Sequence, residues 1–181
     1  MPIRIGQPLD HDFDEPLGLL SDCHRRIEYF LEVLVRLTQS AGQPLTPEQW
    51  KEIEKATDYF AIAAPRHTAD EEESLFPRLR SSNDPSAAQA LECLKQLEED
   101  HEMAAAHHHA VDRFCRRWLD HGFLSDTDMR NLQDRLAELQ AIYREHISIE
   151  DNRLFPAAAQ LLTNKQLLDI GREMAARRSE R

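Results

Sequence analysis

The chain has 181 residues, and its 33 acidic residues outnumber its 22 basic residues, which gives a formal net charge of −11. Hydrophobic residues make up 41 % and charged residues 30 %, a balance that supports one folded domain and excludes disorder by composition. The basic residues are scattered, so no nucleic-acid partner is expected. Glycine occurs only five times, and Leu, Ala, Glu, Gln and Arg outnumber the β-branched residues, which favours helix nearly everywhere.

The cysteines and the N-terminal residues indicate the compartment. Cys23, Cys93 and Cys115 lie far apart and form no CxxC pair, so neither a disulfide framework nor a thiolate zinc site is predicted. The N-terminal residues lack the apolar run of a signal peptide. No stretch approaches the roughly 18 apolar residues of a membrane span. We therefore expect a cytoplasmic protein with no membrane partner.

Apolar residues at helical spacing, interrupted by prolines, glycines and capping residues, predict five helices. The first closes at Ala41 and Gly42, and the second opens with the capping-box residues Thr46 and Gln49. Pro65 lies inside the second helix and is expected to kink it or to remove one hydrogen bond. In chain order the predicted helices cover residues 16–42, 47–77, 84–119, 126–156 and 163–178, and Pro77 and Pro156 are expected to end the second and the fourth.

Long helices joined by short loops pack as antiparallel neighbours. The predicted fold class is therefore all-α: an antiparallel up-down-up-down four-helix bundle with a short extra helix at the C-terminus. The corresponding organisation is an N-terminal arm over residues 1–15, the bundle over 16–160, and a C-terminal helix and tail over 161–181.

Two matching strings end the second and fourth predicted helices. The segment from His67 to Pro77 aligns without a gap with the segment from His146 to Pro156, at an offset of 79 residues. Both strings hold His, Glu four residues later, and Leu-Phe-Pro at the end. An additional histidine precedes each string, His24 by 43 residues and His101 by 45. The chain therefore contains two helical hairpins that each offer an upstream His and a His-x-x-x-Glu pair.

These residues can meet inside a bundle. A His and a Glu four residues apart lie on one helix face. Counting from the hairpin loops places the four histidines at a similar depth, because each residue of a helix advances the chain by about 1.5 Å. Two carboxylates and four imidazoles that converge predict a dinuclear metal site. This donor set, without thiolate, suits iron, zinc, manganese or copper.

Several neighbouring side chains offer alternatives. Glu72 and Glu73 compete with Glu71, and Asp151 competes with Glu150, although the alignment of the two strings favours Glu71 and Glu150. Asp22 lies two residues before His24, and Asp100 lies immediately before His101. Each of these aspartates either orients an imidazole or carries surface charge. The remaining histidines expected at the surface are His11, His107, His109 and His121.

The paired His-x-x-x-Glu and Leu-Phe-Pro strings, with an upstream histidine in each half, resemble the hemerythrin-like, or HHE cation-binding, domains over about residues 16–160. The resemblance implies a four-helix bundle that holds two iron ions in a non-haem di-iron centre bridged by two carboxylates. The ligands that it implies are His24, His67, Glu71, His101, His146 and Glu150.

One position departs from the oxygen-carrying members of that family. They have a second histidine one turn after the first in the third helix, where this chain has Ala105. His108 follows His101 by two turns on the same face and is the candidate for an additional metal-binding imidazole; otherwise it lies behind the ligands or at the surface. Five imidazoles would leave one open coordination position, whereas four would leave two.

The resemblance implies binding or sensing of dioxygen or a related small ligand, such as nitric oxide or peroxide, at an open iron position. The alternative is a stress-response di-iron enzyme or iron donor that reduces nitric oxide or peroxide or repairs iron–sulfur clusters. Repair proteins of this kind usually carry a cysteine-bearing N-terminal domain, which the residues before Pro16 do not supply. A third alternative is an interaction module that the metal folds or switches. Whether the protein is an enzyme, and which protein partner it has, stay open.

Overall fold

The computed structural model describes residues 10–39, 44–82 and 84–179, and these residues form helices and no strands. The all-α class predicted from the sequence is therefore confirmed. Four long helices make up most of the chain, and a shorter helix follows them. The elements are α1 (Pro16–Thr38), α2 (Pro47–Ala69), η1 (Asp70–Leu75), α3 (Phe76–Arg80), η2 (Pro85–Ala87), α4 (Ala88–His121), α5 (Asp126–Ile149), η3 (Glu150–Leu154), α6 (Phe155–Leu161) and α7 (Asn164–Ser179).

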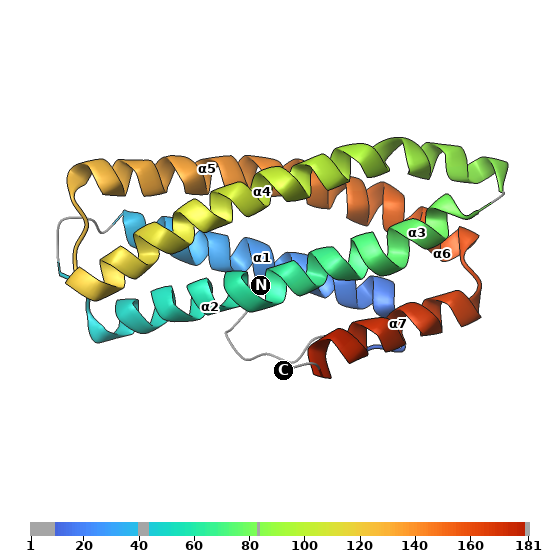
Figure 1. Ribbon diagram of the computed structural model, residues 1–181, viewed down its shortest axis with the longest axis horizontal. Helices are drawn as coiled ribbons and strands as arrows, with labels where there is room; N and C mark the ends of the chain where they lie inside the picture. The colour runs from blue at the N-terminus through green and yellow to red at the C-terminus, as the bar shows by residue number, and fades with distance from the viewer. Residues whose placement is uncertain (1–9, 40–43, 83, 180–181) are drawn as a thin grey trace.

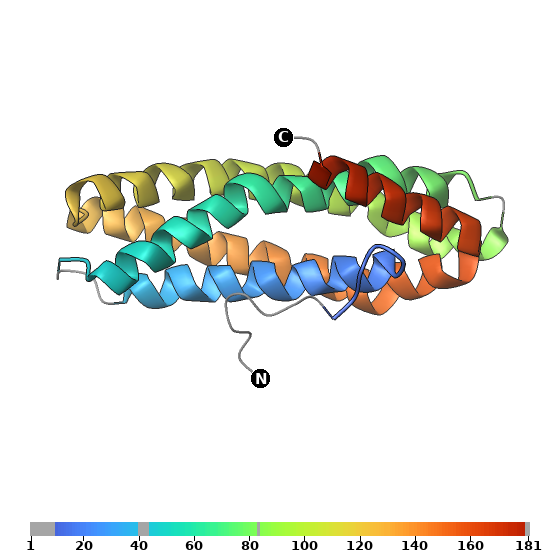
Figure 2. The ribbon, with the colours of Figure 1, turned by 90° about the horizontal axis from the view of Figure 1, so that it is seen from below.

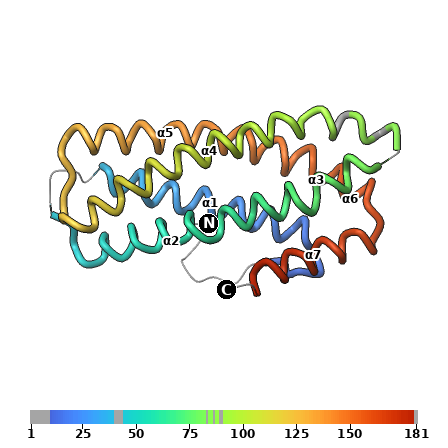
Figure 3. The backbone as a smooth tube through the Cα atoms, in the orientation of Figure 1, coloured from blue at the N-terminus to red at the C-terminus, as the bar shows by residue number. Residues whose placement is uncertain are grey.

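The long helices lie side by side along the longest axis of the molecule, and consecutive helices run in alternate directions (Figures 1 and 3). α1 packs on α2 and α5, and α4 packs on the same two helices from the other side. The last helix, α7, packs on α1 and on η1 at one end of the bundle (Figure 2). Among the described residues, no helix has both the length and the apolar character needed to cross a membrane.

Local sequence explains where the long helices begin and end. The Thr46 side chain accepts a hydrogen bond from the Gln49 backbone, and the Gln49 side chain accepts one in return, which completes the predicted capping box. The Ser125 hydroxyl caps α5 by accepting a hydrogen bond from the Asp128 backbone N–H. α4 ends at Gly122, whose φ of +72° is the left-handed conformation that glycine adopts without strain. The predicted end of the first helix at Ala41 and Gly42 lies outside the described residues.

The prediction that Pro77 and Pro156 end their helices is wrong. In both places the chain passes through a π-helical segment, η1 or η3, and continues as α3 or α6. The backbone N–H of Phe76 donates to the carbonyl of Glu71, five residues back, and Phe155 donates to Glu150 in the same way. A proline lacks an N–H and clashes with the carbonyl four residues back in an α-helix, and the wider π turn accommodates it. Pro65 likewise lies within α2 without ending it.

The core consists of two apolar clusters, one toward each end of the bundle. On α1, for example, Leu20 belongs to one cluster and Ile27 to the other, and His24 lies between them. The same order holds on α4, where His101 lies between Leu97 and Ala104. The histidines of the repeat therefore form a polar layer between two apolar layers.

A buried ion-pair cluster fastens α7 to η1. Asp70 is fully buried, and its two carboxylate oxygens accept from Arg177 at 2.9 Å and from Arg178 at 2.7 Å. Arg177 also donates to the Ser74 hydroxyl at 2.8 Å. Because Asp70 immediately precedes Glu71, these contacts hold the π segment that carries this glutamate.

We expect the substitution Asp70→Ala to lower the free energy of unfolding by about 3 kcal/mol, because it removes the buried partner of two guanidinium groups. A urea denaturation curve measures this. The matched control is Asp169→Ala on α7, whose carboxylate pairs at the surface with Lys165 and Arg172 and whose loss is expected to change stability by no more than about 0.5 kcal/mol. Equal effects of the two substitutions would contradict a stabilising role for the buried cluster.

Candidate metal centre

Six of the seven predicted site residues meet in the polar layer. They come from every long helix: His24 from α1, His67 and Glu71 from the α2–η1 segment, His101 from α4, and His146 and Glu150 from the α5–η3 segment. All six are buried, and both glutamates have no exposed surface. The two π turns begin at or just before the glutamates, so the irregular backbone lies at the site itself.

The six residues form two groups that share both glutamates. Each group is suited to a metal ion, because its four donor atoms lie within 4.8 Å of one another. One group is His24, His67, Glu71 and Glu150, and the other is Glu71, His101, His146 and Glu150.

The glutamate oxygens face different imidazoles. Glu71 directs Oε1 toward His67 Nε2 at 3.3 Å and Oε2 toward His101 Nε2 at 3.3 Å. In Glu150, Oε2 lies 3.0 Å from His24 Nε2 and 3.2 Å from His146 Nε2. Each carboxylate therefore lies between an imidazole of one group and an imidazole of the other, as a carboxylate that bridges two ions would.

The chemistry of the layer fits bound cations. Both oxygens of Glu71 and of Glu150 are buried without a hydrogen-bond partner, and so are the Nε2 atoms of His24, His101 and His146. Buried polar atoms almost always have a partner, because leaving one unpaired costs about 1–3 kcal/mol and more for a charged group. Seven such atoms that face one another fit a metal site better than a hydrogen-bond network.

Carboxylates lie behind three of the four imidazoles, and two of them form hydrogen bonds. Asp151 contacts His24 Nδ1 at 3.0 Å, and Glu72 contacts His101 Nδ1 at 2.8 Å. Such contacts fix the tautomer of a metal-binding histidine and raise its basicity. Asp100 lies 3.5 Å from His146 Nδ1, which is an ion-pair distance. His146 Nδ1 and His67 Nδ1 are both buried without a hydrogen-bond partner.

From the sequence, the acidic residue after each glutamate, Glu72 or Asp151, is expected only as an alternative ligand. Glu72 and Asp151 occupy equivalent places in the two strings, and each contacts the upstream histidine of the other hairpin. The Leu-Phe-Pro strings follow the same symmetry, since Phe155 stacks on His24 and Phe76 on His101, with ring centroids 5.5 and 6.3 Å apart. An acidic residue after both glutamates was the sequence pattern that could have indicated this role.

Burial and charge set the protonation of the layer. Burial opposes a charged His101, but the Glu71 and Glu72 carboxylates outweigh it and raise the pKa of His101 from 6.5 to about 9. For His24, burial is likewise outweighed by Asp151, Glu150 and Glu71, which raise its pKa well above 6.5. Burial alone would raise the pKa of Glu71, yet the neighbouring histidines hold it well below its usual value. Without a metal, protons on two imidazoles balance this carboxylate.

The ring of His67 behaves differently, because burial lowers its pKa to about 4 and outweighs the attraction of Glu71. His67 is therefore neutral at physiological pH, which is the form that binds metal. This ring needs no proton release before it can act as a ligand.

His108 does not join either group. Its Nε2 forms a hydrogen bond of 2.9 Å with the Tyr143 hydroxyl, and its ring stacks on Phe60 with centroids 4.5 Å apart. Burial, together with His107 and His109, lowers the pKa of His108 to about 4. Of the two aspartates considered as orienting residues, Asp100 lies beside His146, whereas Asp22 contacts His11 and Arg25 instead.

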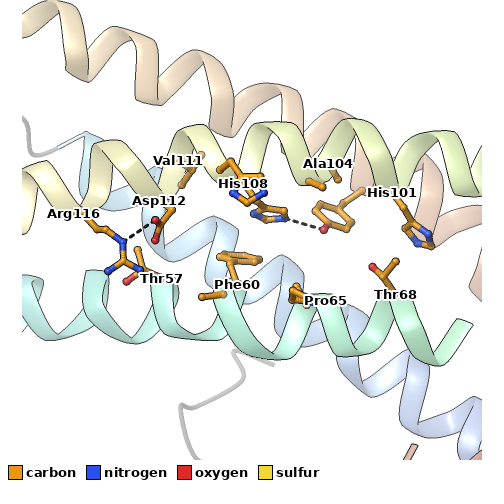
Figure 4. A pocket seen from close by; sticks show the side chains of 15 residues that line it. Thr57, Phe60, Pro65, Thr68, His101, Ala104, His108, Val111, Asp112 and Arg116 are labelled. Atoms are coloured by element: carbon orange, nitrogen blue, oxygen red, sulfur yellow. Dashed lines mark hydrogen bonds and ion pairs between the residues drawn. The ribbon is translucent and has the colours of Figure 1, made fainter. Parts of the chain in front are cut away.

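A cavity of about 440 Å³ leads from the surface between α2 and α4 to His101 (Figure 4). Its wall is mainly apolar and includes Phe60, Ala64 and Ala104. His108 lies in its middle part (Figure 4), and Tyr143 and Ala105 are also in the wall. The cavity therefore gives a small molecule a route to one side of the polar layer.

Comparison with known proteins agrees with this geometry. The family model described as "Hemerythrin HHE cation binding domain" matches residues 15–158. A relative from Haemophilus influenzae, named only as an uncharacterized protein, is 28 % identical over 171 residues, which cover 92 % of this chain and 91 % of the relative. With a family match over most of its length and a buried His/Glu layer in the bundle, the chain belongs to the hemerythrin HHE cation-binding domain family.

Proposed function

We propose that the protein holds two iron ions in the polar layer and binds dioxygen or a related small ligand, nitric oxide or peroxide, there. Glu71 and Glu150 would each contact both ions, His24 and His67 would complete one side, and His101 and His146 the other. The observation that carries the proposal is the pair of four-residue groups that share two buried glutamates with unpartnered oxygens. Imidazole and carboxylate donors without thiolate suit iron.

Bound ferrous iron supplies the electrons or the open coordination position that such a ligand requires. The chain supplies the surroundings. Leu75 and Leu154 are fully buried beside the layer and exclude water from it. This exclusion would slow oxidation of the ferrous iron. The cavity that ends at His101 admits the ligand. The cytoplasmic location stays a prediction from the sequence.

A second candidate function is a di-iron enzyme or iron donor of the stress response. It is favoured by the position of His108, which bonds to Tyr143 and leaves four imidazoles for two ions. Fewer protein ligands leave more room for a substrate beside each ion. Iron–sulfur cluster repair and reduction of nitric oxide or peroxide belong to this candidate.

Exposure of the ferrous protein to air separates the two functions. Protein loaded with ferrous iron without oxygen is exposed to air and then returned to an oxygen-free atmosphere, and its visible spectrum is recorded over several cycles. Reversible binding predicts a spectral change that appears and disappears with little loss of amplitude. A single irreversible oxidation, with consumption of added peroxide or nitric oxide over many turnovers, would contradict reversible binding and support the enzyme.

We expect Asp151→Ala and Glu72→Ala each to weaken iron binding by about 10- to 100-fold, because each removes the carboxylate that orients an imidazole. Competition with a coloured chelator measures the affinity. Glu99→Ala is the matched control, since the Glu99 carboxylate is exposed and pairs only with Lys95 among the contacts described. If the control weakened binding as much as the two variants, the orienting role would be wrong.

The metal-free protein is expected to be most stable near pH 6.5. The pKa of His101 is raised by folding from 6.5 to about 9, so its contribution is complete below 6.5 and is lost as pH rises through 9. The pKa of His67 is lowered to about 4, so the unfolded chain takes up its proton first and stability also falls as pH drops from 6.5 toward 4. The lowered pKa of Glu71 adds to this loss of stability at acid pH.

Urea denaturation of the metal-free protein between pH 4 and 9 measures this profile. The His101→Gln variant is the control and is expected to show a smaller decline on the alkaline side, because His24, whose pKa is also raised by folding, still releases a proton there. A wild-type stability that rises steadily from pH 6.5 to 9 would contradict the assigned shift.

A further inference from the structure

We propose that the cavity between α2 and α4 is a binding site for a neutral, ring-sized organic molecule that carries a hydroxyl group. Its relevance to chemistry at the metal rests on the function proposed above, but the binding itself does not. The cavity runs from Asp112 and Arg116 at one end to His101 at the other, and Phe60 and His108 lie between them (Figure 4).

The cavity is much larger than a diatomic ligand requires. Its volume of about 440 Å³ corresponds to roughly fifteen water molecules at ~30 Å³ each. A dioxygen molecule needs little more than one of these volumes. Pockets for organic ligands begin at about 300 Å³ and are mostly apolar, with a few polar groups that fix orientation.

Small side chains create this space where the two helices face each other. Ala61 and Ala64 on α2 lie opposite Ala104 and Ala105 on α4, and all four line the cavity. Elsewhere in the same core, leucines such as Leu34 and Leu136 are fully buried and fill the space between helices. Packed interiors contain few voids, so an apolar opening of this size beside a metal site is a place for a ligand.

The polar groups in the wall define the chemistry of that ligand. His108 Nε2 is bonded to the Tyr143 hydroxyl, whereas His108 Nδ1 is buried and has no hydrogen-bond partner. A neutral imidazole with a free ring nitrogen can pair with a hydroxyl group. The neighbouring Phe60 ring stacks against His108 and adds a flat apolar face, which suits an aromatic ring.

The charged side chains of the cavity wall are paired. At one end Arg116 donates to Asp112 Oδ2 at 2.7 Å, while Asp112 Oδ1 is buried without a hydrogen-bond partner. At the other end His101 lies against the Glu71 and Glu72 carboxylates. Because each charged side chain has a partner of opposite charge, a neutral ligand fits the site better than an anion or a cation.

The test uses 4-fluorophenol as the probe and fluorobenzene as its analogue without the hydroxyl group. Fluorine NMR titrations with the full chain, in metal-free and iron-loaded form, measure both affinities. We expect 4-fluorophenol to bind with a Kd below about 1 mM and to bind about five- to tenfold more tightly than fluorobenzene, through one hydrogen bond.

Four variants test where the probe binds and what it prefers. Ala64→Leu fills the cavity and is expected to abolish binding, and Ala105→Leu does the same from the more exposed part of the wall if the first variant folds poorly. Ala141→Leu, at an exposed alanine of α5, is the matched control and is expected to bind normally. His108→Phe keeps the ring and is expected to remove the preference for the phenol.

Absence of saturable binding, or binding that both cavity-filling variants leave unchanged, would overturn the proposal. Equal affinity for the two probes would overturn its hydroxyl preference. Iron content measured on the same samples keeps the two proposals apart. Probe binding by a chain that takes up no iron would refute the metal function alone, and iron uptake without probe binding would refute the cavity site alone.

Discussion

The arrangement of this bundle depends on two glutamates buried among four imidazoles. Glu71 and Glu150 have no exposed surface, and their oxygens lack hydrogen-bond donors. Burying an ionised carboxylate costs several kcal/mol unless positive charge or donors offset that cost. Protonated histidines supply the charge when no metal is bound, and two cations would supply more of it. The apolar clusters on either side of the layer keep water out and make this requirement strict.

The internal repeat meets that requirement twice, with one difference between the halves. Glu72 and Asp151 stand behind the upstream histidines, and Phe76 and Phe155 stack on the same rings, so each hairpin supports the other. The symmetry fails behind the other two rings, because Asp100 lies 3.5 Å from His146 Nδ1, whereas no carboxylate of the described residues forms an ion pair with His67 Nδ1. The cavity also opens beside His101. The two halves of the layer therefore differ in the contacts behind their imidazoles and in access, because one side faces the cavity and the other is more enclosed.

Much of the fold could be predicted from the sequence, because helical periodicity, the Thr46 capping box and Gly122 act locally. The convergence of His24, His67, Glu71, His101, His146 and Glu150 could also be predicted, because a repeated spacing constrains depth and face together. The π turns could not be predicted, since Pro77 and Pro156 indicate only that an α-helix is interrupted. The packing of neighbouring helices decides whether the helix ends or continues through a π turn. The hydrogen-bond partner of His108 is Tyr143 on another helix, and the spacing of residues along one helix cannot reveal such a contact.

The most direct test of the account is the number of iron ions that each folded chain holds, measured by elemental analysis together with native mass spectrometry. The account predicts two ions per chain in the wild type. It also predicts that both ions are lost together in Glu71→Ala, because that carboxylate belongs to both groups of donors. A folded wild-type chain without stoichiometric metal, or a Glu71→Ala variant that keeps two ions, would contradict it.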